Sequence, residues 1–92
     1  MSLDGRLLTG VSVLTAVIES GNFARAAEAL GITTSGVSRA VARLEGRVGA
    51  RLLDRTTRSV ALTDEGRRFH DRVKPNLATI EEAAANASCA AG

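Results

Sequence analysis

The sequence predicts a mainly helical fold in which three helices and a two-stranded hairpin come before one long helix. Apolar residues recur every three or four positions over most of residues 7–48, the period of helices that pack by one face. Residues 52–62 hold two short apolar runs around a polar segment of Arg and Thr, the pattern of a hairpin. A second helical stripe of apolar residues continues from Phe69 to Ala87, which predicts a long fourth helix.

The first two helices are expected from residue 3 or 5 to 20 and from about 24 to 30. The first carries an apolar face made of Leu7, Val11, Leu14, Val17 and Ile18. The second is short and rich in alanine, so that another helix can cross it closely. Gly21 and Gly31 follow these segments directly, and glycine is the residue that most often ends a helix in the left-handed conformation.

The third helix is expected over residues 34–49, with Thr33 or Thr34 as its cap. Its apolar stripe comprises Val37, Val41, Leu44 and Val48. The opposite face comprises Ser35, Arg39, Ala42 and Gly46, flanked by Ser38 and Arg43. A face of short side chains and arginines lets the helix backbone approach a large anion, and the major groove of DNA admits one α-helix. This pattern predicts a DNA-recognition helix.

Positive charge is concentrated in the same region. The chain has a formal charge of +2, but residues 33–58 contain six arginines and two acidic residues, a local charge of +4. A local basic zone is the electrostatic footprint of a protein that binds duplex DNA. On spacing alone, the arginines of the third helix also fit a plain solvated face without a partner.

The hairpin is predicted to pair residues 52–54 with residues 59–62. The turn between them carries Arg55 and Arg58 at its tip, with Thr57 beside them. Arginines at a hairpin tip next to a groove-bound helix are well placed for the adjacent minor groove or its phosphates. Helix, turn, helix and hairpin together predict a winged helix-turn-helix domain over residues 1–62.

The fourth helix is expected as a linker and dimerisation helix over residues 63–87, followed by a flexible tail at 88–92. Thr63 is the expected cap, and the two acidic residues after it favour a helix start. Pro75 should bend this helix or loosen one turn.

The apolar stripe of the fourth helix extends beyond the reach of a small core. Its predicted dimer-interface residues are Val73, Leu77, Ile80 and Ala84. Pairing two such helices antiparallel would bury both stripes and produce a two-fold interface. The alternative is that the stripe packs wholly on its own domain.

The run from Ala26 to Gly66 resembles the N-terminal DNA-binding region of LysR-type transcriptional regulators. The matching features include Ala26-Ala27, Val37-Ser38-Arg39, Leu44-Glu45, Val48-Gly49, Leu52-Leu53, Arg55, Arg58 and Leu62-Thr63. The resemblance implies a homodimer on a pseudo-palindromic operator. It implies that Thr34 and Ser35 read bases, that Ser38 and Arg39 are the family's Ser-Arg pair, and that Arg58 is its wing arginine. The full set of predicted DNA contacts is Thr33, Thr34, Ser35, Ser38, Arg39, Arg43, Arg55, Thr57 and Arg58.

Three departures from the family pattern carry expectations of their own. Thr34-Ser35 stands where a Gln-Pro or Pro-Ser pair is frequent, so the base preference does not transfer. Ala24 stands where a Ser or Thr cap is usual, which predicts fraying of the second helix. Family members continue into an effector-sensing domain that lies outside these 92 residues, so we expect a small-molecule effector to act only through that domain.

Other function classes find little support in the sequence. His70 has no second His or suitable Cys partner, so neither a catalytic site nor a metal or other cofactor is expected. Cys89 is the only cysteine, which excludes an intramolecular disulfide. An RNA or single-strand binder would need stacking platforms, but Phe23 and Phe69 occupy core-type positions. A winged helix that binds only proteins would present an apolar recognition face, whereas the outer face expected here carries arginines and short side chains. With no signal peptide or membrane-spanning run, the expected location is the cytoplasm.

Overall fold

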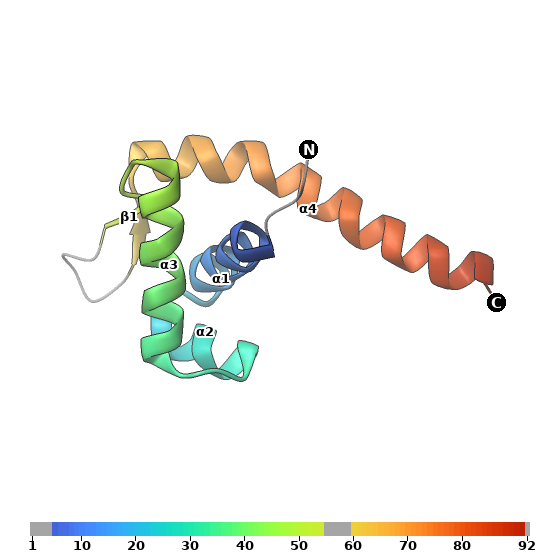
Figure 1. The fold of residues 1–92 in the computed structure, drawn as a ribbon, viewed down its shortest axis with the longest axis horizontal. Coiled ribbons are helices and arrows are strands. Elements are labelled where there is room, and N and C mark those ends of the chain that lie inside the picture. The colour runs from blue at the N-terminus through green and yellow to red at the C-terminus, as the bar shows by residue number, and fades with distance from the viewer. Residues whose placement is uncertain (1–4, 55–59, 92) are drawn as a thin grey trace.

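The computed structural model describes residues 5–54 and 60–91, with side chains as far as residue 87 (Figure 1). The elements are α1 Gly5–Ser20, α2 Phe23–Leu30, α3 Thr34–Val48, β1 Leu53–Asp54, β2 Ala61–Leu62 and α4 Asp64–Ala91. The first three helices pack against one another, whereas α4 crosses the body and then extends away from it (Figure 1). The predicted fold class, a winged helix-turn-helix followed by a long helix, is confirmed.

The hydrophobic core is shared by the three short helices and the start of the hairpin. Its buried residues are Val11, Val13, Leu14, Val17, Ala26, Ala27, Val37, Val41, Leu44, Leu52 and Leu53. Helices α1 and α3 approach closely at Gly10, where a Cβ atom would lie 3.1 Å from the Cβ of Leu44. Full burial of one such aliphatic side chain contributes about 1.5–3 kcal/mol. The core therefore fixes the rotation of α3 about its own axis.

Helix α2 has a cap that the sequence analysis missed. It begins at Phe23, and the extended residue Asn22 accepts a hydrogen bond on its side-chain oxygen from the N–H of Arg25 at 2.7 Å. The expectation that an absent cap at Ala24 frays this helix is wrong, because the capping side chain lies two residues earlier. Gly31 ends the helix in the left-handed conformation at φ 69°, as predicted.

The apolar stripe of α3 is buried except at its end. Val37 and Val41 are fully buried and Leu44 is 2% exposed, as predicted, but Val48 is 39% exposed. Val48 is the last residue of α3, and the chain turns away directly after it at Gly49, which has a φ of 83°. The prediction for Val48 was wrong because helical spacing carries no information on where the covering core stops.

The hairpin is shorter than predicted. Two residues of each strand pair antiparallel, with Leu53 opposite Leu62 and Asp54 opposite Ala61. Val60 and Leu62 are half-buried against the core and Ala61 is exposed, which confirms the predicted alternation. The predicted turn, residues 55–58, lies outside the described residues.

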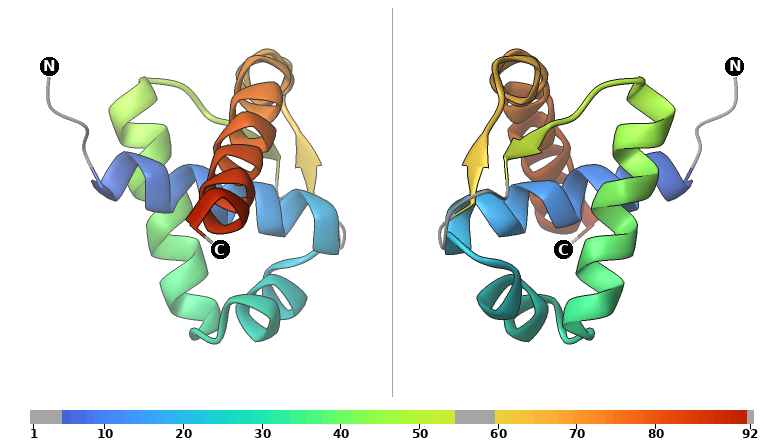
Figure 2. Two further views of the ribbon diagram at one scale, coloured as in Figure 1. Left: turned by 90° about the vertical axis from the view of Figure 1, so that its right-hand side faces the viewer. Right: turned by 90° about the vertical axis from the view of Figure 1, so that its left-hand side faces the viewer.

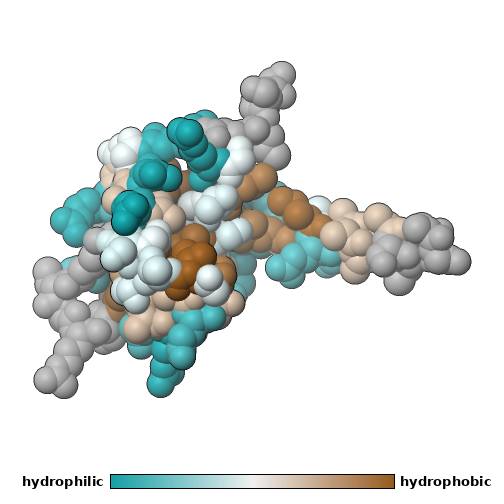
Figure 3. Space-filling model, turned by 60° about the horizontal axis from the view of Figure 1, so that its bottom comes forward, coloured by the Kyte–Doolittle hydropathy of each residue, from teal (hydrophilic) through white to brown (hydrophobic). Residues whose placement is uncertain are grey.

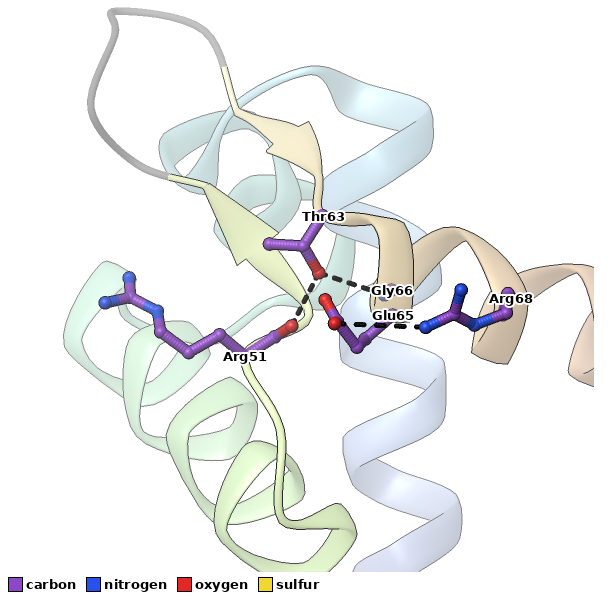
Figure 4. A network of polar contacts seen from close by, with 5 residues as sticks. All are labelled: Arg51, Thr63, Glu65, Gly66 and Arg68. Atoms are coloured by element: carbon purple, nitrogen blue, oxygen red, sulfur yellow. Dashed lines mark hydrogen bonds and ion pairs between the residues drawn. The ribbon is translucent and has the colours of Figure 1, made fainter.

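Helix α4 is tied to the segment before the hairpin through its cap, Thr63 (Figure 4). The Thr63 Oγ1 accepts a hydrogen bond from the N–H of Gly66 at 3.0 Å and donates one to the carbonyl of Arg51 at 2.5 Å. The N–H of Thr63 donates to the carbonyl of Leu52 at 3.0 Å. A Cβ atom on Gly66 would lie only 2.0 Å from that same carbonyl oxygen, so this close approach requires glycine.

Helix α4 continues to Ala91 and includes four of the residues for which the sequence predicts a flexible tail. Residues 83–91 are mostly alanine, the strongest helix former, which accounts for the longer helix. Pro75 lies inside the helix, where it lacks an N–H to donate. Figure 1 shows the helix axis changing direction in its middle part, in agreement with the predicted bend.

The apolar stripe of α4 divides into two parts. Phe69, Val73 and Leu77 are half-buried and pack against the core, whereas Ile80 is 55% exposed and Ala84 is exposed. The alternative in which the whole stripe packs on its own domain is therefore wrong. Its second part stands in solvent on the extended portion of the helix (Figure 1).

Candidate nucleic-acid interface

The face of α3 that points away from the core consists of short side chains and arginines. Ser35, Arg39, Ala42 and Gly46 are exposed, as predicted, and so are Thr34 and Arg43. Ser38 is half-buried at the edge of this face. Because the opposite side of the helix is held in the core, the polar face has one fixed orientation. No rearrangement of α3 is needed to present it to a partner.

The N-terminal end of α3 is suited to an anionic partner. Thr33 is exposed, and its Oγ1 accepts a hydrogen bond from the N–H of Gly36 at 3.0 Å, which confirms the predicted cap. The hydroxyl hydrogen of Thr33 is not used in this bond and can be donated to another group. The first turn contains no acidic residue, so the partial positive charge of the helix end is not neutralised from within that turn.

The base of the hairpin is held beside α3 by Glu45. One carboxylate oxygen, Oε2, accepts hydrogen bonds from the N–H groups of Leu52 at 2.8 Å and Leu53 at 3.2 Å. The right-hand view of Figure 2 looks onto α3 and both strands together. The two strands therefore lie on the same side of the molecule as α3.

The predicted contact residues fall into two groups. The structure brings Thr33, Thr34, Ser35, Ser38, Arg39 and Arg43 together along α3. Arg55, Thr57 and Arg58 lie outside the described residues. Arg6 of α1 and Arg47 of α3, neither of them among the predicted contacts, line a small hollow together with Arg43. No spacing rule could have found it, because the three residues meet only where two helices cross.

A second surface lies between α1 and α4. It is a groove of about 310 Å³ lined by Ser12, Thr15, Ala16, Glu19, Leu77, Ile80 and Glu81. Figure 3 shows apolar side chains gathered where α4 leaves the body of the molecule. The groove contains the partly exposed end of the apolar stripe of α4.

The described part of the chain has neither a metal cluster nor a membrane span. Among those residues, no group of three or more His, Cys, Asp and Glu side chains is placed to hold a metal ion. No helix of residues 5–54 or 60–91 is both long enough and apolar enough to span a membrane.

The sequence matches a known family over most of its length. The family model described as bacterial regulatory helix-turn-helix protein, lysR family, matches residues 8–67. The transcriptional regulator CrgA of Neisseria meningitidis serogroup B is 48% identical over 64 residues, 70% of this chain and 21% of that protein. The transcriptional repressor PA14_22550 of Pseudomonas aeruginosa is 41% identical over 75 residues, 82% of this chain and 24% of that protein. The chain thus spans less than a quarter of these relatives.

Solved structures resemble the chain closely. The DNA-binding domain of BenM in complex with catB site 1 DNA has a TM-score of 0.85 at 29% identity, covering 92% of this chain and 96% of that one. The DNA-binding domain of CbnR in complex with DNA has a TM-score of 0.77 at 28% identity, covering 91% and 97%. Both relatives were crystallised as DNA-binding domains in complex with DNA.

Proposed function

We propose that this chain, which belongs to the lysR family of bacterial regulatory helix-turn-helix proteins, reads duplex DNA with the outer face of α3 in the major groove. It is the DNA-binding domain of a LysR-type transcription regulator and not an enzyme.

The contrast between the two sides of α3 carries the proposal. One side is buried, and the other is exposed and bears hydroxyls and guanidinium groups without a large apolar side chain in its middle. A protein-interaction surface would present apolar residues at these positions. Short side chains allow the helix backbone to approach the floor of the groove, which is about 12 Å wide in B-form DNA.

The residues of α3 take different roles in this arrangement. Thr34 and Ser35, in the first turn, read base edges, because the N-terminal residues of a recognition helix lie deepest in the groove. Arg39, one turn further on, contacts a backbone phosphate. Thr33, Ser38 and Arg43 flank this line and fix the position of the helix on the duplex.

The hairpin supplies the second contact. Its strands leave the body on the side that α3 presents, held there by the carboxylate of Glu45. We assign Arg55, Thr57 and Arg58 of the intervening turn to the adjacent minor groove or its phosphates.

The domain acts as a homodimer through α4. Ile80 and Ala84 stand exposed, and with Leu77 and Val73 they continue the apolar stripe toward the core. A second copy of α4, running antiparallel, would cover the exposed part and enter the groove beside α1. Two-fold symmetry sets two recognition helices about 34 Å apart or a multiple of that distance, which requires a pseudo-palindromic operator. In a bacterium, such a partner places the protein in the cytoplasm.

Selection of duplexes from a random pool tests this function. We expect the unmodified chain to enrich a palindrome with two half-sites, and Ser35→Ala to change the preference at one or two positions of each half-site. A change of about 1–3 kcal/mol at those positions is the size expected for one base contact. Failure of the chain to enrich any duplex over its starting frequency would refute the proposal.

A further inference from the structure

Three arginines from two helices meet around one hollow on the side of α3 that faces away from the hairpin. Arg6 of α1 and Arg43 and Arg47 of α3 line a space of about 200 Å³. In the right-hand view of Figure 2, the N-terminal end of α1 emerges on one side of α3 and the strands lie on the other. The contacts proposed above use Arg43 alone among the three, so most of this cluster is unaccounted for.

The close approach of α1 and α3 at Gly10 brings these arginines together. Gly10 allows α1 to approach α3 so closely that a Cβ atom there would lie 3.1 Å from the Cβ of Leu44. Arg6 precedes Gly10 by one helical turn, while Arg43 and Arg47 lie on either side of Leu44 along α3. The floor of the hollow is apolar, since the other described residues that line it are Leu7, which is half-buried, and Leu44, which is buried.

The charges of the hollow favour an anion. Among the described residues, no Asp or Glu lines it, and all three arginines are exposed. Arg43 and Arg47 are four residues apart on one helix, an arrangement in which like charges destabilise the helix. A guanidinium group has five N–H donors in a planar fork, so an arginine that already has an intramolecular contact keeps donors for a phosphate. Carboxylate and phosphate oxygens both match this fork, and on a duplex the anion within reach is the phosphate of the backbone.

We propose that Arg6, Arg43 and Arg47 together bind one phosphodiester group of the DNA backbone, on the strand that borders the major groove opposite the hairpin. This inference rests on the proposed function, because it requires α3 to lie in the groove. It gives the recognition helix a backbone contact on each side, the hairpin on one and the arginine cluster on the other. Such a contact fixes the position of the domain on the duplex and carries no sequence information.

The double variant Arg6→Gln with Arg47→Gln tests the cluster. Binding is measured by fluorescence anisotropy at several salt concentrations, with a duplex selected by the unmodified chain and with a mixed-sequence duplex of equal length. We expect weaker binding to both duplexes by a similar factor, and a salt slope reduced by about 0.9 for one lost phosphate contact. The control, Arg68→Gln with Arg72→Gln, removes the same charge from exposed positions of α4 and should leave the slope unchanged.

The phosphate itself is located by moving a single uncharged methylphosphonate along each strand. In each half-site, we expect one position at which the methylphosphonate weakens binding of the unmodified chain. At that position, the Arg6→Gln, Arg47→Gln variant should bind the methylphosphonate duplex as well as it binds the unmodified duplex. Circular dichroism confirms that each variant is folded. If the double variant behaves like its control while Arg39→Ala still binds weakly, the cluster inference falls and the proposed function stands. If Arg39→Ala also binds as the unmodified chain does, the proposed docking of α3 itself is wrong.

Discussion

Helices α3 and α4 carry equally regular apolar stripes, but the chain covers them differently. In α3, three of four stripe residues lie in the core, and only Val48 at the very end is exposed. In α4, Val73 and Leu77 reach the core, whereas Ile80 and residues 81–87 are exposed. The comparison shows that the same helical pattern marks a core face in one case and, by our proposal, a subunit interface in the other.

The largest effect is expected in the covered stripe. Leu44→Ala should lower the free energy of unfolding by about 2–5 kcal/mol, because it removes buried methyl groups and leaves a cavity. Ile80→Ala, made as the matched change in the uncovered stripe, should shift the unfolding free energy of the monomer by no more than about 0.5 kcal/mol. Urea denaturation at low protein concentration measures both. Equal losses at the two positions would contradict the comparison.

The second-largest effect on the free energy of unfolding is expected at Gly66, where α4 joins the rest of the domain. Gly66→Ala places a Cβ atom against the carbonyl oxygen of Leu52, so the first turn of α4 must move away from the hairpin. We expect a loss of at least about 1–3 kcal/mol, the usual size for overpacking. Gly46→Ala is the control: it lies inside α3 with open space around it, and it should stabilise the helix by about 0.5–1 kcal/mol. Thermal unfolding followed by circular dichroism distinguishes the expected destabilisation by Gly66→Ala from the expected stabilisation by Gly46→Ala.

Substitutions in the uncovered stripe should change dimerisation and leave the stability of the monomer unchanged. Ile80→Asp buries a charge in the proposed dimer interface, and we expect the dimer dissociation constant to rise at least tenfold, about 1.4 kcal/mol. Leu77 is a poorer site for this test, because it also packs on its own core. Asn86→Asp adds the same charge on the opposite face of α4 and should have little effect. Analytical ultracentrifugation gives the answer, and a strictly monomeric unmodified chain at high concentration would reject the dimer.

The smallest effect is expected on the polar side of α3. Arg39→Ala should weaken binding to all duplexes alike and lower the salt slope by about one unit, as for one phosphate contact. Its unfolding free energy should stay within about 0.5 kcal/mol of the unmodified value, since the side chain is exposed. Filter binding at several salt concentrations tests this, and a loss confined to one sequence would instead make Arg39 a base-reading residue.

Features set by local sequence were predicted well. The ends of α1 and α3, the caps Thr33 and Thr63, and the left-handed Gly31 follow from side chains within one helical turn of the position. The cap at Asn22 was missed because the family pattern places the cap at position 24. The capping side chain lies two positions before it. The exposed face of α3 was predicted from helical period alone, which is the part of the candidate site that the sequence determines.

Features that depend on where helices cross were not predicted. The division of the α4 stripe after Leu77 depends on how far the core extends under the helix, which the stripe itself does not encode. The meeting of Arg6 with Arg43 and Arg47 depends on the close approach at Gly10, between segments far apart in the sequence. The helical state of residues 88–91 follows from alanine propensity, a signal that was present in the sequence but outweighed by proximity to the chain end.

The bonds of Thr63 also have a mechanical meaning. Through that residue, the start of α4 is attached to the carbonyls of Arg51 and Leu52, and Glu45 attaches the same segment to α3. The first turn of α4, the hairpin and the recognition helix are therefore joined by hydrogen bonds, without an intervening loop. At Gly66 the backbone of α4 packs directly on the backbone of Leu52, with no room for a side chain between them, so the start of α4 and the base of the hairpin keep one fixed arrangement.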